Sequence, residues 1–383
     1  MQNFDVIIVG AGAAGSSSAL ALARRGKKVL LLEQFSVPHE RGSSHGHSRI
    51  FRFAYDDPDY ARFAMRSLAA WRDLERETKQ TLLHLFGGLD VGQAGNASLE
   101  RTAQAMTEVG ANFERLDAAA LMQRFPQWHV PPDWVGLLSP DAGIVMPSRA
   151  VEVMTAYARS LGVTLLEHCE VLGFDDNTVR TSNGDFSAAQ IVIAAGAWLP
   201  KLVPELAAQL EVTQEASAYF APKDLQAFMP EQFPIFIDHN SLAYGFPAQG
   251  LPGVKLGWHQ SGPVVNPDTR AFDVPTTTLE TLHRWLETHL PNQDWRLIQA
   301  RSCLYTNTPS HDFILDFHSS STLLVSPCSG HGFKFAAYIG QLVADKLLGV
   351  ANPFDLPRFK LASALQAGEA KLLSRGILQQ PST

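Results

Sequence analysis

The sequence predicts an α/β chain, α+β overall, in which a parallel sheet is interleaved with a second, mainly antiparallel sheet. Three observations favour this fold class. The chain opens with a strand, a glycine-rich turn, a helix and a second strand, and strand-like runs return to this first sheet after two long excursions. With 383 residues, 45% of them hydrophobic, the chain can bury a large core and is long enough for two domains.

The opening segment has the pattern of a Rossmann-like unit. Phe4 to Val9 is an unbroken apolar run, the turn Gly10 to Gly15 follows, and Ser16 to Arg25 is expected to form a helix. A second apolar run, Val29 to Leu32, leads directly into Glu33. A strand, a tight glycine turn, a helix and a strand with an acid at its end are typical of dinucleotide binding.

Each part of this unit has a physical role. Gly10 permits the sharp turn, Gly12 lets the backbone approach a pyrophosphate at the helix N-terminus, and Gly15 lets helix and strand pack closely. Glu33 can accept hydrogen bonds from a ribose hydroxyl. The alternative is a tight turn between strand and helix that holds no ligand.

A loop of small polar residues follows Glu33. It extends from Gln34 to Ser48 and is suited to wrapping a cofactor. Arg49 and Arg52, three positions apart just after it, share a face if a helical turn begins there. The alternative is two solvated surface arginines. Apolar residues at helical spacing then predict a helix from Asp59 to Lys79.

Two excursions interrupt the first sheet. Residues 82–147 contain a short strand and two helices and have the texture of an insertion. A helix ending at Leu161 and strand-like runs at 164–166, 170–174, 178–181 and 190–195 bring the chain back. Alternating runs and proline-rich turns from about residue 211 then predict an antiparallel sheet.

The last return begins at Thr322 to Val325 and enters a helix expected from Phe335 to Leu348. We therefore expect a cofactor-binding domain made of residues 1–81, 148–210 and 320–383, and a substrate domain made of residues 82–147 and 211–319. The polar tail after Leu356 is expected to be a helical extension.

Composition excludes several classes of partner. The net charge of -7 and the lack of a basic run argue against nucleic acid. No apolar run is long enough to span a membrane, and the chain enters its first strand at once, so we expect neither a membrane anchor nor export. Three cysteines without zinc-site spacing fit a reducing cytoplasm. His45 and His47 have no third ligand grouped with them, so no metal site is expected.

A second cofactor contact favours a flavin over a nicotinamide. The strand-like run from Gln190 to Ala195 ends in Gly196, which would bring a second stretch of backbone to the cofactor. The glycine-rich loop from Gly330 leads into a helix whose N-terminus would stabilise the negative charge of a reduced flavin. A nicotinamide enzyme remains the alternative and predicts a colourless protein.

The sequence resembles the monomeric sarcosine oxidase and N-methyltryptophan oxidase family of FAD-dependent amine oxidoreductases, within the glycine oxidase and D-amino-acid oxidase superfamily. The matching stretches occur in family order over nearly the whole chain. They are Gly10 to Gly15, Gly42 to Arg52, Tyr244 to Pro247, Lys255 to His259, Cys303 to Pro309 and Ser329 to Phe335.

This resemblance implies roles for individual residues. Cys303 would join the flavin covalently, with Cys169 and Cys328 as weaker candidates. The catalytic group would be Lys255, Arg49, His45, Tyr244 and His259. The substrate would be bound by Arg52, Lys334, Tyr244 and His259. FAD would be bound by Gly10, Gly12, Ala13, Ala14, Gly15, Glu33, Gln34, Ser43, Ser44, Arg49, Val171, Ala195, Gly196, Trp198, Cys303, Gly330, Gly332 and Lys334.

The resemblance also implies the reaction. Arg52 and Lys334 would hold the carboxylate of a small secondary amino acid. A hydride equivalent would leave the carbon beside the neutral amine nitrogen, water would hydrolyse the imine, and dioxygen would be reduced to hydrogen peroxide beside Lys255. The family also implies a monomer.

Alternatives remain open. A dehydrogenase would use a quinone or protein acceptor in place of dioxygen, and a non-catalytic module would keep the fold for binding. Two departures, His47 in place of an acid and Trp258 in place of a smaller ring, leave sarcosine, other N-methyl amino acids and cyclic amino acids all open as substrates.

Overall fold

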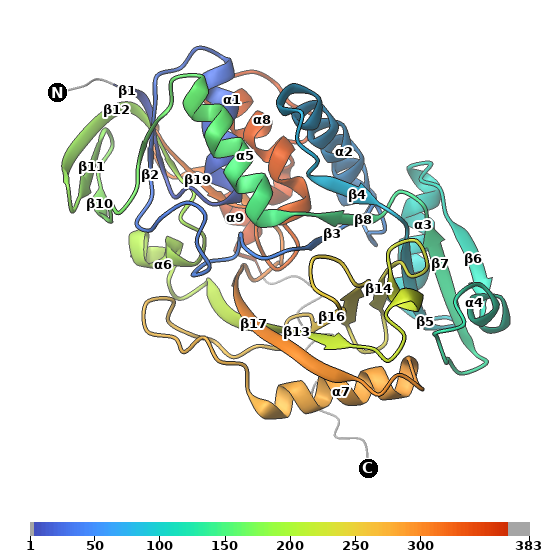
Figure 1. Ribbon diagram of the computed structural model, residues 1–383. Helices are drawn as coiled ribbons and strands as arrows, with labels where there is room; N and C mark the ends of the chain where they lie inside the picture. The colour runs from blue at the N-terminus through green and yellow to red at the C-terminus, as the bar shows by residue number, and fades with distance from the viewer. Residues whose placement is uncertain (1–3, 367–383) are drawn as a thin grey trace.

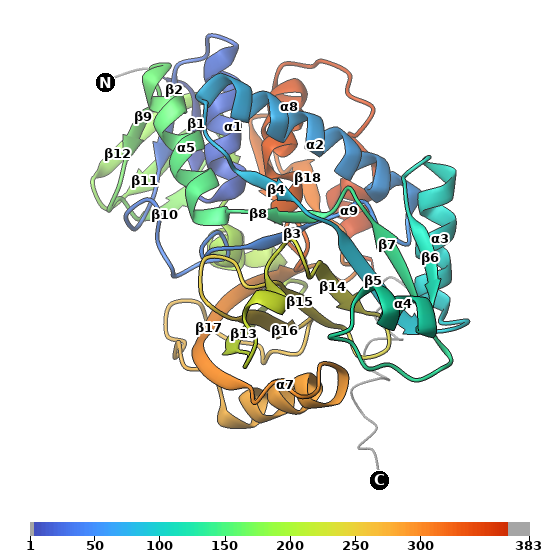
Figure 2. The same cartoon turned by 45° about the vertical axis from the view of Figure 1, so that its right-hand side comes forward.

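The computed structural model describes residues 4–366. Two large sheets lie in opposite halves of the molecule, with a small three-stranded sheet between them (Figure 1). A layer of helices covers the first sheet, and a single long helix covers the outer face of the second (Figures 1 and 2). This is the mixed architecture that the sequence predicts.

The first sheet has a parallel centre in the order β9, β2, β1, β12 and β19. Its strands are β1 (Phe4–Val9), β2 (Val29–Leu32), β9 (Thr164–Leu166), β10 (Val171–Phe174), β11 (Thr178–Thr181), β12 (Gly184–Ile193), β18 (Ile314–Phe317) and β19 (Thr322–Ser326). The β10–β11 hairpin and β18 add antiparallel edges. Segments from the beginning, middle and end of the chain therefore meet in one sheet.

Helices α1 (Ala13–Arg24), α5 (Pro147–Ser160) and α8 (Ala336–Leu347) cover one face of this sheet, and α1 contacts the other two. Val6 and Ile8 point into that helical layer, whereas Ile7 and Val9 belong to a separate apolar cluster on the opposite face. Burial of both faces explains the unbroken apolar runs of the parallel strands. A Cβ on Gly340 of α8 would lie 2.2 Å from the Ser17 carbonyl oxygen, so glycine permits the close approach of α8 to α1.

The second sheet has the order β17, β13, β16, β15, β14, β5, β7, β6. Its strands are β5 (Gly88–Gln93), β6 (Glu114–Asp117), β7 (Trp134–Ser139), β13 (Glu211–Ala221), β14 (Ile235–Asp238), β15 (Ala243–Phe246), β16 (Val254–Trp258) and β17 (Arg296–Asn307). Among these strands, β5 and β14 are the parallel pair. Helices α3 (Ala97–Glu108) and α4 (Ala118–Arg124) contact the β5–β7 end.

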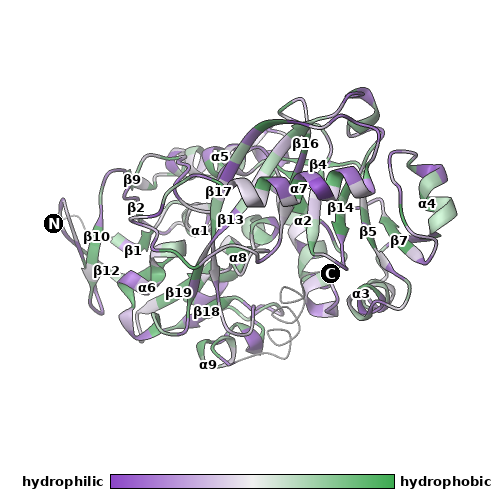
Figure 3. Cartoon of the chain, turned by 90° about the horizontal axis from the view of Figure 1, so that it is seen from below, coloured by the Kyte–Doolittle hydropathy of each residue, from purple (hydrophilic) through white to green (hydrophobic). Residues whose placement is uncertain are grey.

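Helix α7 (Thr276–His289) lies across the outer face of β13 and β16. It buries Leu282, Trp285 and Leu286, while the side seen in Figure 3 is largely hydrophilic. Strands β3 (Arg49–Phe51), β8 (Gly143–Val145) and β4 (Leu83–Leu85) form the small sheet between the two large ones. The other helices are α2 (Pro58–Thr78), α6 (Leu199–Leu202) and α9 (Leu361–Ala364).

The structure corrects several expectations about local elements. Arg49 begins strand β3, so Arg49 and Arg52 do not share a helical turn. The run expected at 190–195 is the end of one longer strand, β12, whose first half pairs with β11. Strand β18 pairs with β19 in the first sheet, although the expected boundary at residue 319 assigns it to the second domain.

Among residues 4–366, the tail after Leu356 contains a 3-10 turn at Pro357–Phe359 and the short helix α9, and the remainder of that expected helical extension lies outside the described residues. Within the same range, no helix combines the length and apolar character needed to cross a membrane.

Candidate functional site

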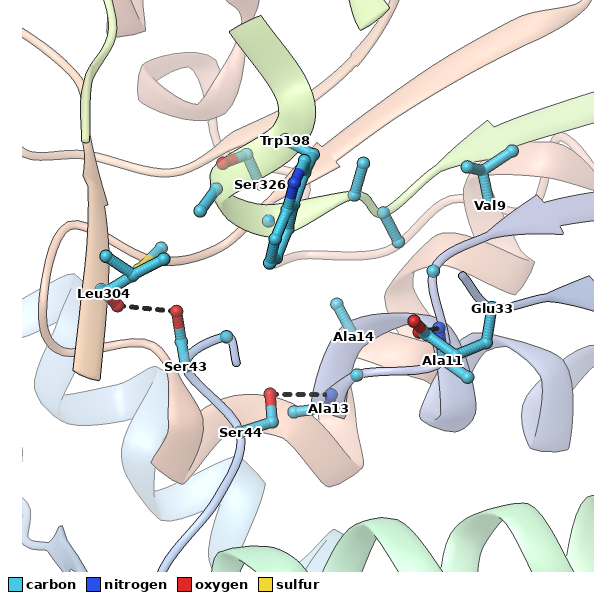
Figure 4. A pocket seen from close by; sticks show the side chains of 18 of the residues that line it. Val9, Ala11, Ala13, Ala14, Glu33, Ser43, Ser44, Trp198, Leu304 and Ser326 are labelled. Atoms are coloured by element: carbon cyan, nitrogen blue, oxygen red, sulfur yellow. Dashed lines mark hydrogen bonds between the residues drawn. The ribbon is translucent and has the colours of Figure 1, made fainter. Parts of the chain in front are cut away.

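A long cavity lies where the C-terminal ends of β1 and β2 meet the N-terminus of α1. It encloses about 1500 Å³ of empty space, including its open mouth. In Figure 4, Glu33 lies at one end of the cavity and Leu304, with Ser43, at the other. Trp198 lies across from Ala14. An elongated site of this kind suits an extended dinucleotide.

The glycine turn forms the floor of the cavity. Gly10 has a φ of +97°, and a Cβ there would lie 2.5 Å from the Ala194 carbonyl oxygen. A Cβ on Gly15 would lie 1.8 Å from the Gly10 carbonyl oxygen. Helix α1 starts at Gly12 without a cap from that residue, and the N–H of its first residue, Ala13, donates to the Ser44 hydroxyl at 3.1 Å. The positive end of the helix dipole still favours an anion in the cavity.

The end of β2 supplies the acid that the sequence predicts. Glu33 is 5% exposed, and its carboxylate accepts hydrogen bonds from the backbone N–H groups of Ala11 at 2.8 Å and Phe35 at 3.0 Å. Each carboxylate oxygen has a second lone pair that can accept a hydrogen bond from a hydroxyl in the cavity. The donors and acceptors present therefore fit a pyrophosphate and a ribose.

All of the predicted cofactor-binding residues line the cavity except Gly15 and Lys334. Gly15 instead lies behind the turn, against the Gly10 carbonyl. The Lys334 ammonium points away from the cavity because it donates to the Tyr55 hydroxyl and to the His331 carbonyl, each at 2.7 Å. Helix α8 is nevertheless preceded by Gly330 and Gly332, which do line the cavity.

Sequence reasoning did not single out several other lining residues. They include Val37, Pro38, His39, Lys201, Leu304, Tyr305, Ser326 and Phe333. Asp268, from the second excursion, accepts a hydrogen bond from the Trp198 indole at 2.7 Å and from Lys201 at 3.0 Å. Lys201, Ser326 and Asp268 lie outside the stretches that the sequence singled out, because only the tertiary fold brings them to this site. The other residues lie within such stretches but had no role assigned to them individually.

Cys303 and Arg49 line the end of the cavity opposite Glu33. Cys303 lies on β17, is free and partly exposed, and lines the cavity. Burial raises the pKa of its thiol, while Arg49 and Lys255 nearby act to lower that pKa. The Arg49 guanidinium donates to the carbonyl oxygens of Ser43 at 2.9 Å and Ser48 at 3.0 Å.

Lys255 and His45 are both buried beside Arg49. Lys255 is 5% exposed, and its ammonium donates to the Ser48 carbonyl at 3.1 Å and lies 4.6 Å from the centre of the Phe246 ring. Burial, then Arg49, lowers the pKa of Lys255 to about 7. Burial, then Arg49, also lowers the pKa of His45 to about 3. Neither ring nitrogen of His45 has a hydrogen-bond partner among the described residues.

The residues expected to bind the substrate lie behind the cavity wall and do not line it. Arg52 and Lys334 converge on Tyr55: the guanidinium carbon is 5.2 Å and the ammonium 5.1 Å from the centre of that ring. Burial, followed by the charge of Arg52, lowers the pKa of Lys334 well below its usual value. Two cations from distant segments therefore share one buried site.

Tyr244 and His259 reach the same region through a shared neighbour. The Tyr244 hydroxyl hydrogen-bonds to Tyr305, and the His259 ring centre lies 5.7 Å from that of Tyr305. A Cβ on Gly330 would lie 2.3 Å from the Tyr305 ring and 2.7 Å from the His259 ring. Because Tyr305 and Gly330 line the cavity, they separate it from the cluster behind.

The buried Lys255 makes a prediction about stability. Its folded pKa of about 7 lies below the ordinary value of 10.5, so the unfolded chain binds more protons between these two pH values. Burial of Lys255 therefore lowers the free energy of unfolding by its full amount below about pH 7, and this loss disappears as the pH rises toward 10.5. We expect Lys255→Met to raise the free energy of unfolding near pH 7 by on the order of 2–4 kcal/mol.

Denaturant unfolding near pH 7 and again near pH 9.5 measures this effect, and the advantage of the variant should shrink at the higher pH. The exposed Lys223, changed to methionine, serves as the control and should show no such trend. An advantage that grows with pH would contradict the assigned burial of a cationic Lys255.

Comparisons with known proteins agree with this geometry. Residues 5–346 match the DAO family model, described as FAD dependent oxidoreductase. The chain is 30% identical over 373 residues to monomeric sarcosine oxidase of Bacillus sp. (strain NS-129), covering 94% of this chain and 96% of the relative. It is 33% identical over 372 residues to N-methyl-L-tryptophan oxidase of Citrobacter koseri, covering 94% and 99%.

Solved structures show the same fold. NikD, described as an unusual amino acid oxidase essential for nikkomycin biosynthesis, superposes with a TM-score of 0.82 at 26% identity, covering 94% of this chain and 98% of NikD. The L-proline dehydrogenase of P. horikoshii has a TM-score of 0.82 at 18% identity, covering 98% and 99%, which is a likeness of fold alone. The dinucleotide that the cavity fits is therefore FAD, and the chain belongs to the DAO family of FAD-dependent oxidoreductases, resembling sarcosine and N-methyltryptophan oxidases over nearly its whole length.

Proposed function

We propose that this protein is an amino-acid oxidase that oxidises the C–N bond of a small secondary amino acid to an imine and reduces dioxygen to hydrogen peroxide. The observation that carries the proposal is the convergence of Arg52 and Lys334, from segments 282 positions apart, on one buried ring, Tyr55. Two cations at a buried site suit a carboxylate. When bound, FAD supplies the oxidising power, taking a hydride from the carbon beside the amine and passing electrons to dioxygen.

The cavity residues would hold the cofactor. The first turn of α1 would bind the pyrophosphate, and Glu33 the ribose hydroxyls. Cys303, at the other end of the cavity, would be joined by a thioether to the 8α-methyl carbon of the flavin. In that linkage the thiol and the methyl group would each give up one hydrogen, and dioxygen would take the two electrons. Burial raises the pKa of its thiol, and the positive charges of Arg49 and Lys255 nearby offset part of that rise.

The cluster behind Tyr305 would bind and orient the substrate. The guanidinium of Arg52 and the ammonium of Lys334 would hold the carboxylate, and the same positive charges would favour the neutral form of the substrate amine. Burial, then His311 and Arg52, lowers the pKa of His259 to about 3, so its ring is neutral at physiological pH. A neutral His259 can accept a hydrogen bond from the amine, with the Tyr244 hydroxyl closing the other side.

The dioxygen step would depend on positive charge rather than on a general base. Lys255 has a pKa of about 7, so a substantial fraction of its side chains is protonated at neutral pH. A buried ammonium stabilises negative charge that develops on dioxygen, and low dielectric surroundings strengthen this effect. Arg49 beside it adds to the same field. We also propose that the protein works as a monomer in the cytoplasm.

The test is a screen of secondary amino acids for hydrogen peroxide, run beside reduction of an artificial dye. Sarcosine, N-methyl-L-tryptophan and L-proline represent small, bulky N-methyl and cyclic substrates. The proposal predicts peroxide in amounts equal to the amino acid oxidised. Dye reduction without peroxide would establish the alternative, a dehydrogenase with a quinone or protein acceptor.

The carboxylate site makes its own prediction. Arg52→Met is expected to lower kcat/KM for the best amino acid about 100-fold, because it removes a buried, hydrogen-bonded charge partner. The matched control is Arg62→Met, since Arg62 lies exposed on α2 and pairs only with surface acids. Steady-state kinetics with the amino acid and with its decarboxylated amine measure the effect. An equal loss for both substrates would rule out a carboxylate contact.

A further inference from the structure

A buried acid lies directly against the arginine proposed to bind the substrate. Asp90, on β5, is 3% exposed, and its Oδ1 accepts a hydrogen bond from Arg52 Nη1 at 2.8 Å. The same oxygen lies 2.9 Å from Nε2 of His239. His239 Nδ1 in turn lies 3.1 Å from the hydroxyl of Ser98 at the start of α3. The sequence motifs did not draw attention to Asp90 or His239.

The fold explains why Asp90 faces Arg52. Its neighbours on β5, Leu89 and Val91, both point into the apolar core of the second domain, so Asp90 points to the opposite face. Strand β14 lies parallel to β5, and the backbone N–H of His239 donates to the Val91 carbonyl at 2.8 Å. This pairing places the imidazole beside the carboxylate. A buried carboxylate in a strand is costly unless it is paired, and here it is paired twice.

The hydrogen bonds have one consistent direction. An ionised Asp90 can only accept hydrogen bonds, so Nε2 of His239 carries a hydrogen and donates a hydrogen bond to the carboxylate. In the neutral ring, Nδ1 is then the acceptor for the Ser98 hydroxyl. The Ser98 hydroxyl therefore donates to His239, and both His239 and Arg52 donate to Asp90. A carboxylate held in this way has little freedom to rotate.

Within the described residues, one nitrogen makes all the hydrogen bonds of Arg52. Nη1 donates to Asp90 and also to the Ala54 carbonyl, which uses both of its hydrogens. Among residues 4–366, Nε and Nη2 make no hydrogen bond. These two nitrogens form the side of the guanidinium that binds a carboxylate with two parallel hydrogen bonds.

We propose that Asp90 is a positioning residue: it anchors Arg52 Nη1, with His239 holding the anchor in place, so that the Nε and Nη2 edge is presented to the substrate carboxylate. This inference rests on the proposed function. An arginine side chain has many rotamers, and fixing one of them costs conformational entropy. If the side chain is ordered before the ligand binds, binding no longer bears that entropy cost. Tyr55, whose ring lies 5.2 Å from the guanidinium carbon, restricts it further.

The test measures ligand affinity in the flavin-containing protein through the change in flavin absorbance. The probe is cyclopentanecarboxylate, and cyclopentanecarboxamide is its uncharged match. Asp90→Ala is expected to weaken carboxylate binding on the order of tenfold or more while changing amide binding less than about threefold. Asp90→Asn keeps an acceptor for Nη1 and should recover most of the affinity.

His239 provides a second pair of variants that leave Asp90 intact. Glutamine can place a donor near the position of Nε2, so His239→Gln should bind the carboxylate about as tightly as the natural protein does. His239→Leu has no such donor and should weaken carboxylate binding on the order of threefold to tenfold. When an amino-acid substrate is used, Asp90→Ala and His239→Leu should both raise KM and leave kcat within about twofold. A purely structural role would instead lower kcat and thermal stability together.

The outcomes separate this inference from the proposed function. Carboxylate binding that stays equal or becomes tighter in Asp90→Ala would overturn the positioning role, because Asp90 would then only compete for Arg52. Equal weakening of the carboxylate and the amide would overturn it as well. Failure of the natural protein to bind the carboxylate at all would overturn the proposed carboxylate site itself, and with it this inference.

Discussion

Lys255→Met is expected to slow the reaction with dioxygen about 100- to 1000-fold while leaving reduction of the flavin by the amino acid within about threefold. Lys255 is 5% exposed, and its ammonium has one hydrogen bond, to the Ser48 carbonyl. No acid pairs with it among the described residues, so no carboxylate compensates its charge. Methionine keeps the volume and removes that charge.

Stopped-flow measurement of the two half-reactions distinguishes the steps. The amino acid is first mixed with the protein without oxygen, and the reduced protein is then mixed with dioxygen. Lys255→Arg is the matched control, because it keeps a positive charge and should retain much of the dioxygen rate. Unchanged reoxidation in Lys255→Met would remove this role from Lys255.

Cys303→Ala is expected to change the fate of the flavin completely. In the natural protein, the flavin should stay with the polypeptide after denaturation in acid, and in the variant it should be released. The reason is local: Cys303 lines the cavity at the end opposite Glu33, where Arg49 and Lys255 offset part of the rise in thiol pKa that burial causes. Fluorescence of the separated polypeptide measures the bound fraction.

The other two cysteines provide controls for that experiment. Cys328 also lines the cavity, and its sulfur accepts a hydrogen bond from the Thr306 backbone at 3.3 Å. Cys169 is buried and lies near the end of the cavity where Glu33 is located. Cys328→Ala and Cys169→Ala should both keep the flavin attached. Release from Cys328→Ala, with retention in Cys303→Ala, would move the link to Cys328.

Much of the fold could be predicted because its strongest signals are local. Gly10 and Gly15 are fixed by a left-handed turn and a close backbone contact, and both constraints act within the first fifteen residues. Apolar runs buried on both faces marked β1 and β2. The boundaries were less certain where pairing decides them: β12 is one strand because its first half pairs with β11 and its second half with β1 and β19.

The site divides in the same way. Glu33 and the turn follow from local pattern, and Cys303, Lys255 and Lys334 follow from the resemblance to a family. Asp90 could not be predicted from sequence. In the sequence it is one polar residue in a short strand. The parallel pairing of β5 with β14 places His239 beside it, and the tertiary fold brings Arg52 to the same carboxylate.

The central claim is that this cavity and the cluster behind Tyr305 together oxidise a secondary amino acid on FAD. The most direct measurement mixes the yellow protein with sarcosine, N-methyl-L-tryptophan and L-proline in turn, without oxygen, and then admits air. We predict that at least one of them bleaches the flavin, and that in air the colour returns as the amino acid is consumed, with hydrogen peroxide equal to the amino acid oxidised. A flavin that stays yellow with every secondary amino acid, but is bleached by amines without a carboxylate, would contradict the claim.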